Sequence, residues 1–366
     1  MDRISGFSDD ALLVMILSFL PTKDADDMKR DFLIKLGNSN MMRRFIDRNL
    51  SLHNSPVIES LCLDLFTDAF QPEDIKLRIL VDVPHAFCLP SKALHLRRVI
   101  YADEESLQRL LSNSSVLEDL VLELYPGDIV RKFAVIIPSL LSFYFLLCGR
   151  CTCDGYIIDT PSLTYFKAFD YSQTTSPCFI VKNMPKLEEA QLCAGHNARK
   201  LLQAVTSVKR LSLLVEDNNT AEAVYGDDIV FNKLEHLNFR TYKTFWSKLL
   251  FQLLNASPKL RDFTFNDNST MGVPVCWKQL NSVPQCLLSS LQTFKWLGLH
   301  ISVQAKDLAT YILRNSCLLK TATISLPETN LELLETEVKS CLRGLPTCNL
   351  VFTEEWDYGE TYFWWP

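Results

Sequence analysis

A short unit of apolar and polar positions recurs along this chain. Its first, fourth and sixth places are apolar, and most of the places between them are polar. In the clearest copy these places hold Leu117, Leu120 and Leu122. Side chains alternate between the two faces of a strand, so the pattern predicts a short β-strand with one face against a core. The unit starts again, in steps of 21 to 31 residues, at Leu140, Leu163, Leu187, Val208, Leu234, Leu260, Leu291 and Leu319.

Helices are predicted between some of these strands. Leu107, Leu110 and Leu111 follow the cap candidate Asp103, and a similar leucine-rich group at 249–254 follows Trp246. One strand and one returning segment every 20 to 30 residues is typical of leucine-rich repeats, in which stacked units share a continuous core. We therefore expect an α/β fold, a leucine-rich-repeat solenoid with a curved parallel sheet and a helical or irregular convex side. Its inward-pointing residues should include Leu120, Leu122, Leu211, Leu213, Leu237 and Phe265.

Charge and composition indicate which classes of partner the protein is expected to bind. The net charge is −6, with Lys+Arg 37 against Asp+Glu 43 and no basic stripe, so nucleic acid is not expected. The apolar run at residues 11–20 is too short to span a bilayer, and it follows Asp9 and Asp10 rather than the positive charge of a signal peptide. We expect no membrane partner, an intracellular location in the cytoplasm or nucleus, and reduced thiols for the 12 Cys.

The sequence contains little evidence for a catalytic site or a metal site. Cys148, Cys151 and Cys153 form the most metal-like cluster, but no second Cys pair or nearby His completes a zinc site. Cys148 lies eight residues after Leu140, where leucine-rich repeats carry a small polar residue in the turn, so we interpret it as structural. The six His are scattered, and neither a nucleophile elbow nor a phosphate-binding glycine run occurs. The sequence predicts no enzyme, no cofactor and no metal.

The N-terminal residues carry a separate signal. Ser8 or Asp9 can begin a helix that has one apolar stripe and that Pro21 ends. One interpretation is a helix that covers the end of the solenoid. However, residues 4–24 resemble the first half of a plant F-box, a small helical module that docks on the Skp-family adaptor of a cullin ubiquitin ligase. The resemblance assigns adaptor binding to Leu12, Leu13, Ile16, Leu17, Leu20 and Pro21.

After Asp24 the chain departs from the F-box pattern. The family continues with an apolar helix and a Ser-Lys-Arg-Trp segment, whereas residues 25–31 here read Ala-Asp-Asp-Met-Lys-Arg-Asp. Residues 45–53 resemble the helix that follows the F-box, so a middle segment is missing. Residues 277–316 resemble the FBD region of plant F-box/LRR proteins. The predicted order is a partial F-box-like helical segment (1–50), leucine-rich repeats (55–270), an FBD region continuing the array (271–352) and a C-terminal tail (353–366).

Three hypotheses about function follow. The family implies a substrate-recognition subunit of a cullin ubiquitin ligase, whose partners would be the adaptor, the cullin and an unknown target protein. The missing segment favours a stand-alone recognition scaffold that has lost ligase coupling. A small-molecule receptor with its pocket in the concave face is a third.

A target site is predicted on the concave face. The third, fifth and seventh places of each unit point away from the core. On neighbouring strands these places hold aromatic and cationic residues, the types that dominate binding hot spots. We expect a partner segment of apolar and acidic character to bind at Tyr144, Tyr165, Lys167, Phe169, Arg210 and Arg240. The alternative is that the curvature of the array packs these rings against one another.

Overall fold

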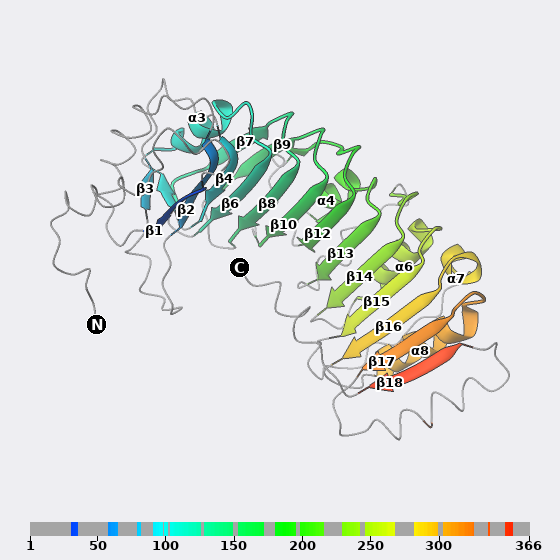
Figure 1. The fold of residues 1–366 in the computed structure, drawn as a ribbon. Coiled ribbons are helices and arrows are strands. Elements are labelled where there is room, and N and C mark those ends of the chain that lie inside the picture. The colour runs from blue at the N-terminus through cyan, green and yellow to red at the C-terminus, as the bar shows by residue number, and fades with distance from the viewer. Residues whose placement is uncertain are drawn as a thin grey trace, which may run out of the picture. The chain divides into compact units, whose positions relative to one another are not determined.

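The protein is represented by a computed structural model of residues 1–366 (Figure 1). It describes residues 31–35, 58–64, 79–81, 91–97, 99–101, 103–125, 128–148, 153–171, 180–194, 198–215, 229–241, 246–267, 282–298, 303–325, 336 and 348–353. These residues belong to two compact units, Met1–Thr160 and Pro161–Pro366.

Parallel strands, in chain order, form the main sheet of the first unit (Figure 1). It contains β1 (Asp31–Lys35), β2 (Ile58–Asp64), β4 (Ser91–Leu96), β6 (Asp119–Leu124) and β8 (Ser142–Leu147). Helix α3 (Ser106–Ser112) lies between β4 and β6 in the chain. Two further parallel pairs join β3 (Ile79–Val81) to β5 (Val99–Tyr101), and β7 (Lys132–Ile136) to β9 (Gly155–Asp159).

The pair β7 and β9 differs from the helical or irregular returning segments predicted from sequence. Phe133 and Val135 on β7, and Tyr156 and Ile158 on β9, are buried at alternate positions, which suits strands rather than helices. The Phe133 and Tyr156 rings lie 5.8 Å apart, and the Tyr156 ring lies 5.1 Å from that of Phe145 on β8. A second strand layer therefore covers the core beside β8.

The second unit has a longer parallel sheet, also in chain order (Figure 1). Its strands are β10 (Tyr165–Asp170), β12 (Glu189–Ala194), β13 (Arg210–Val215), β14 (His236–Thr241), β15 (Asp262–Asp267), β16 (Thr293–Gly298), β17 (Thr321–Ser325) and β18 (Asn349–Thr353). Its other elements are β11 (Ile180–Val181), α4 (Ala198–Ala204), α6 (Ser247–Ala256), α7 (Gln285–Ser289) and α8 (Val303–Asn315).

The register of this sheet is the same at every pair from β10 to β18. The fourth place of each unit lies opposite the fourth place of the next, as Leu211 does to Leu237 and Leu237 to Phe263. The apolar fourth and sixth places therefore form continuous rows across the strands. The inward orientation predicted for Leu120, Leu122, Leu211, Leu213, Leu237 and Phe265 is confirmed, because all six are buried.

Helices α3 and α6 confirm the two helical predictions. Their leucines are buried, and the chain leaves each helix at or just after Asn113 and Asn255, where turns are expected. Trp246, the residue before α6, lies with its ring 4.6 Å from that of Phe265 on β15. The helix is thus held against the apolar rows of the sheet.

A serine just before the first place of a unit joins some neighbouring turns. Ser139 donates to the Leu117 carbonyl at 2.7 Å, Ser207 to the Met184 carbonyl, and Ser290 to the Leu260 carbonyl at 2.8 Å. Each bond links one unit to the unit before it. The same place in other units holds Lys186, Lys233 and Lys259, and no hydrogen bond within the described part of the chain joins these lysines to the preceding turn.

The N-terminal predictions fall mostly outside the described residues. Leu12, Leu13, Ile16, Leu17, Leu20 and Pro21 all lie there. Of residues 1–50 the structure describes only β1, which pairs in parallel with β2. A helical segment was predicted for this range, and that prediction is wrong for Asp31–Lys35. These residues read Asp-Phe-Leu-Ile-Lys, a short apolar run that suits a strand as well as a helix.

Candidate functional site

Two rows of mainly polar side chains line the face of the second sheet that was predicted to be concave. We call this the open face, and it is made by the third and fifth places of each unit. The third-place row is Tyr165, Glu189, Arg210, His236, Asp262, Thr293, Thr321 and Asn349, and the fifth-place row is Lys167, Gln191, Ser212, Asn238, Thr264, Lys295, Thr323 and Val351. Because every strand keeps the same register, these residues form straight rows across the strands.

The seventh place does not belong to this surface, and here the prediction is wrong. Phe169 is 1 % exposed and Arg240 is 2 % exposed, so neither is accessible to a partner. The Phe169 ring stacks on the ring of Tyr171, just after the strand, with centroids 6.3 Å apart. The Lys167 ammonium lies 5.2 Å from the centroid of the Phe169 ring. Alternation along a strand predicts which face a side chain points to, but it does not predict whether residues after the strand cover that side chain.

A hollow of about 410 Å³ lies on the open face over β12 to β16. Its polar lining comes from the third and fifth places, including Glu189, Arg210, Ser212, His236, Asn238, Asp262, Thr264, Thr293 and Lys295. Among the predicted target residues, Arg210 lines the hollow. Tyr165 and Lys167 lie in the same rows on β10, next to β12. Tyr144 belongs to the first unit.

The acidic groups of the hollow are engaged by neighbours. His236 Nδ1 lies 2.9 Å from Asp262 Oδ2, and Gln191 donates to Glu189 Oε1 at 3.4 Å. The sequence contains the signal for the His236–Asp262 contact, since each residue lies two places after the first leucine of its unit. Register makes such residues neighbours, although they are 26 positions apart in the chain. Burial raises the pKa of Tyr165, and the charge of Glu189 raises it further.

The two cations of the hollow differ from these acids. Arg210 and Lys295 are exposed, and the side chain of neither forms an ion pair or hydrogen bond within the described residues. Arg210 lies opposite Glu189 in register, but no ion pair joins the two. The hollow therefore presents two uncommitted positive charges beside acids that already have partners.

The first unit carries a second polar cluster on the corresponding places. His95 Nε2 lies 2.6 Å from Asp119 Oδ2 on the next strand. Burial favours a higher pKa for Asp119, but hydrogen bonds from His95 and Ser142, together with the charges of His95 and Arg97, outweigh it and lower the pKa. The lowered pKa keeps Asp119 in its carboxylate form beside the His95 ring.

Tyr144, a predicted target residue, lies beside this cluster. The Arg97 guanidinium is 5.8 Å from the Tyr144 ring centroid and 3.7 Å from the buried carboxylate of Glu123. Tyr125 also donates its hydroxyl to Glu123, at 3.0 Å. Tyr144 is thus part of a packed polar network within the first unit.

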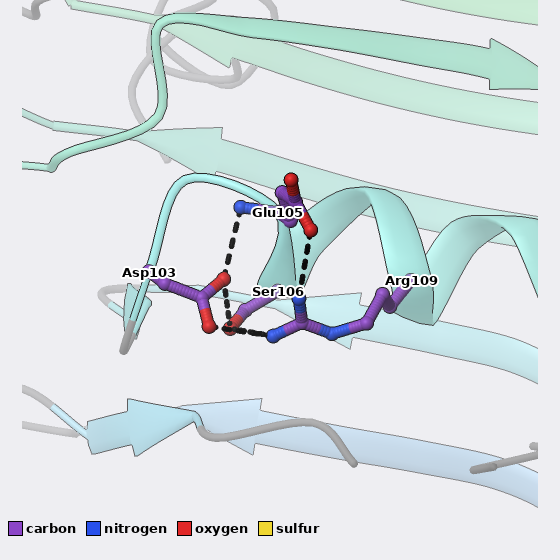
Figure 2. Close-up of polar contacts among 4 residues, drawn as sticks. All are labelled: Asp103, Glu105, Ser106 and Arg109. Carbon is purple, nitrogen blue, oxygen red and sulfur yellow. Dashed lines mark hydrogen bonds and ion pairs between the residues drawn. The ribbon is translucent and has the colours of Figure 1, made fainter. Parts of the chain in front are cut away.

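The acidic residues before α3 form contacts at the start of that helix, whose N-cap is Glu105 rather than the predicted Asp103 (Figure 2). Asp103 accepts hydrogen bonds from the Glu105 backbone N–H and the Ser106 hydroxyl, at 2.9 and 3.0 Å. Arg109 lies 2.6 Å from Asp103 and 3.3 Å from Glu105. The Arg109 hydrogen bond, more than the bonds from Ser106 and Glu105, lowers the pKa of Asp103 to about 2.

The cysteine cluster is described only in part. Cys153 is buried and its thiol lies 3.5 Å from the Gly155 carbonyl, while Cys151 lies outside the described residues. Within the described ranges, three or more His, Cys, Asp or Glu side chains nowhere gather as they would around a metal ion. None of the described helices is long and apolar enough to cross a membrane.

Comparison with known proteins identifies the family. The FBD family model matches residues 279–324, which include α7, β16, α8 and β17, and the Leucine Rich Repeat model matches residues 92–115. An F-box/FBD/LRR-repeat protein of Arabidopsis thaliana is 50 % identical, covering 96 % of this chain and 100 % of the relative. This chain belongs to the plant F-box/FBD/LRR-repeat family. Two FBD-associated F-box proteins of the same plant are 51 and 36 % identical, covering 89 and 96 % of this chain and 82 and 100 % of the relatives.

This F-box/FBD/LRR-repeat protein is shorter than the relative that it matches at 50 % identity. The aligned span is 452 positions and the chain has 366 residues, so the relative has segments with no counterpart here. An F-box is not detected, although the relatives are named for one. The leucine-rich-repeat fold and the FBD region of the family are both present.

Proposed function

We propose that this protein is the substrate-recognition subunit of an SCF-type cullin ubiquitin ligase and that the open face of the second unit binds the target protein. Membership of the F-box/FBD/LRR-repeat family carries the ligase assignment. In this role the protein is not an enzyme, and other subunits carry out ubiquitin transfer. A location in the cytoplasm or nucleus, where such ligases assemble, is part of the proposal.

The hollow supports target binding at the open face. Its floor is a regular sheet whose apolar side is occupied by the core, and its polar rows lie on the opposite side. Sites built on rigid strands hold their side chains in fixed positions, which lowers the entropy cost of binding. Tyr165, Lys167 and Arg210 remain the target-binding residues of this proposal. Phe169 and Arg240 are buried, and the residues that line the hollow take their place in it.

The adaptor would bind at the N-terminal stripe, as the resemblance implies. This surface comprises Leu12, Leu13, Ile16, Leu17, Leu20 and Pro21. A second candidate function is a stand-alone recognition scaffold without ligase coupling. It is favoured by the sequence after Asp24, which departs from the F-box pattern, and by the absence of a detected F-box.

Co-purification with a Skp-family adaptor separates the two functions. The ligase role predicts that the full chain retains the adaptor, and that the substitution Ile16→Asp, in the stripe, abolishes retention. Met15→Asp, outside the stripe, adds the same charge and serves as the matched control. Inserting the family's helical segment after Asp24 should strengthen adaptor retention. If the native chain retains none and the insertion restores it, the scaffold function is correct for this protein.

A further inference from the structure

The acidic and basic side chains of the hollow differ in whether they have partners. Its acids, Glu189 and Asp262, already have neighbours: Gln191 donates to Glu189, and His236 Nδ1 lies 2.9 Å from Asp262 Oδ2. Its cations, Arg210 and Lys295, are exposed and have no side-chain partner within the described part of the chain. The acidic residues just outside the rows, Glu188 and Glu235, are also paired, with Lys209 at 3.3 Å and with Arg261 at 3.7 Å. Arg210 and Lys295 are therefore the charged side chains of the hollow that have no side-chain partner within the described residues, and a ligand carboxylate can pair with each.

We infer that the hollow binds an extended acidic segment of the target protein, with one carboxylate at Arg210 and another at Lys295. The inference rests on the proposed function, because it names the class of target that the open face recognises. Charge-assisted hydrogen bonds to a carboxylate are stronger than neutral ones, and Arg holds a carboxylate through two parallel bonds. Unpaired cations three strands apart in one hollow thus favour a ligand with two separated acids.

The register of the sheet sets the spacing of these acids. Arg210 is on β13 at the third place, and Lys295 is on β16 at the fifth place. Three strand spacings and two residues along a strand place their Cα atoms about 16 Å apart. An extended peptide advances about 13 Å over four residues and returns its side chain to the same side. Acidic residues at positions i and i+4 therefore match two long cationic side chains.

Between the two cations the hollow offers groups that can bind a peptide backbone. Ser212, Asn238 and Thr264 occupy neighbouring fifth places in the middle of the hollow. The Oδ1 atom of Asn238 is covered and has no hydrogen-bond partner within the described residues. Rotation of this amide toward the hollow presents both a donor and an acceptor to a peptide group. A peptide that crosses the strands would meet these three residues in turn.

Selection from a random library of 12-residue peptides, displayed on phage and bound to the full chain, tests the inference. The expected peptides carry pairs of Asp or Glu four residues apart. Replacing both acids by Gln in a selected peptide should weaken its binding at least tenfold. The double variant R210E/K295E should lose the same factor, and it should bind the peptide in which both acids are Lys. Lys233→Glu changes an exposed lysine outside the hollow and should leave the affinity unchanged.

Several results would overturn the inference. These are selected peptides without acidic pairs, acidic peptides that bind R210E/K295E as tightly as the native chain, or no selected peptide at all. Binding is measured on this chain alone, so it does not depend on the adaptor. If the chain binds acidic peptides but does not retain the adaptor, the ligase role is wrong and the inference stands. If the chain retains the adaptor but does not bind acidic peptides, only the inference is wrong.

Discussion

Truncating Leu213 to Ala tests whether the apolar rows hold the second unit together. Leu213 is 0 % exposed, and it lies between Leu192 and Phe239 in register, both also buried. The change removes three carbon groups, worth about 2.4 kcal/mol at about 0.8 kcal/mol for each. Strands in fixed register on both sides limit collapse, so a residual cavity should bring the loss to about 3–5 kcal/mol of unfolding free energy.

Urea unfolding followed by far-UV circular dichroism measures this loss, and amide hydrogen exchange locates it. Leu288→Ala in α7 removes the same atoms from a side chain that is 48 % exposed, so it should cost about 1 kcal/mol or less. Exchange in the Leu213 variant should rise first in β12 to β14, because each repeat is stabilised mainly by its neighbours. Equal unfolding midpoints for the two variants would refute the assigned core.

Two further outcomes are expected from the pKa shifts. Arg109→Met should raise the pKa of Asp103 from about 2 toward its ordinary value. The Asp103 carboxylate contributes its full stabilisation at a pH above the ordinary pKa of Asp, and this stabilisation is lost as the pH falls through about 2. An NMR titration of Asp103 in the wild-type chain with a midpoint near 4 would contradict the lowered pKa. Burial raises the pKa of Cys286 to about 12, so iodoacetamide at pH 8 should alkylate the exposed Cys317 and spare Cys286 in the folded chain. Equal labelling, read by peptide mass spectrometry, would show that Cys286 is accessible.

The strands of the repeat units were predictable from the sequence because their signal is local and repeated. Every unit from Leu117 to Leu319 carries its apolar places at the same spacing, so each strand supports the assignment of the others. The β7 and β9 strands were missed, although Phe133 and Val135 alternate as strand residues do. They occur between the repeated units, where leucine-rich repeats commonly have helical or irregular chain, and an alternation this short does not by itself distinguish a strand from these.

The candidate site was predictable in part. The rows that line the hollow follow from the unit pattern, and Arg210 was found in this way. Alternation does not predict the burial of Phe169 and Arg240; for Phe169 a residue beyond the strand, Tyr171, stacks on the ring. The contact between His236 and Asp262 follows from a shared register, which becomes reliable only when each strand is aligned with its neighbour.

The serine bonds between turns are distributed unevenly beneath the hollow. Ser207 joins the units of β12 and β13, and Ser290 joins those of β15 and β16. Between them, Lys233 and Lys259 occupy the corresponding places at the two central boundaries. Backbone hydrogen bonds join the two central boundaries, as in the Glu235 and Arg261 N–H groups donating to the Lys209 and Glu235 carbonyls, but the additional serine bond is present only at the two outer boundaries. We expect the sheet to flex most along β14, so that a bound segment would be gripped by a slight tightening of curvature rather than by the movement of a loop.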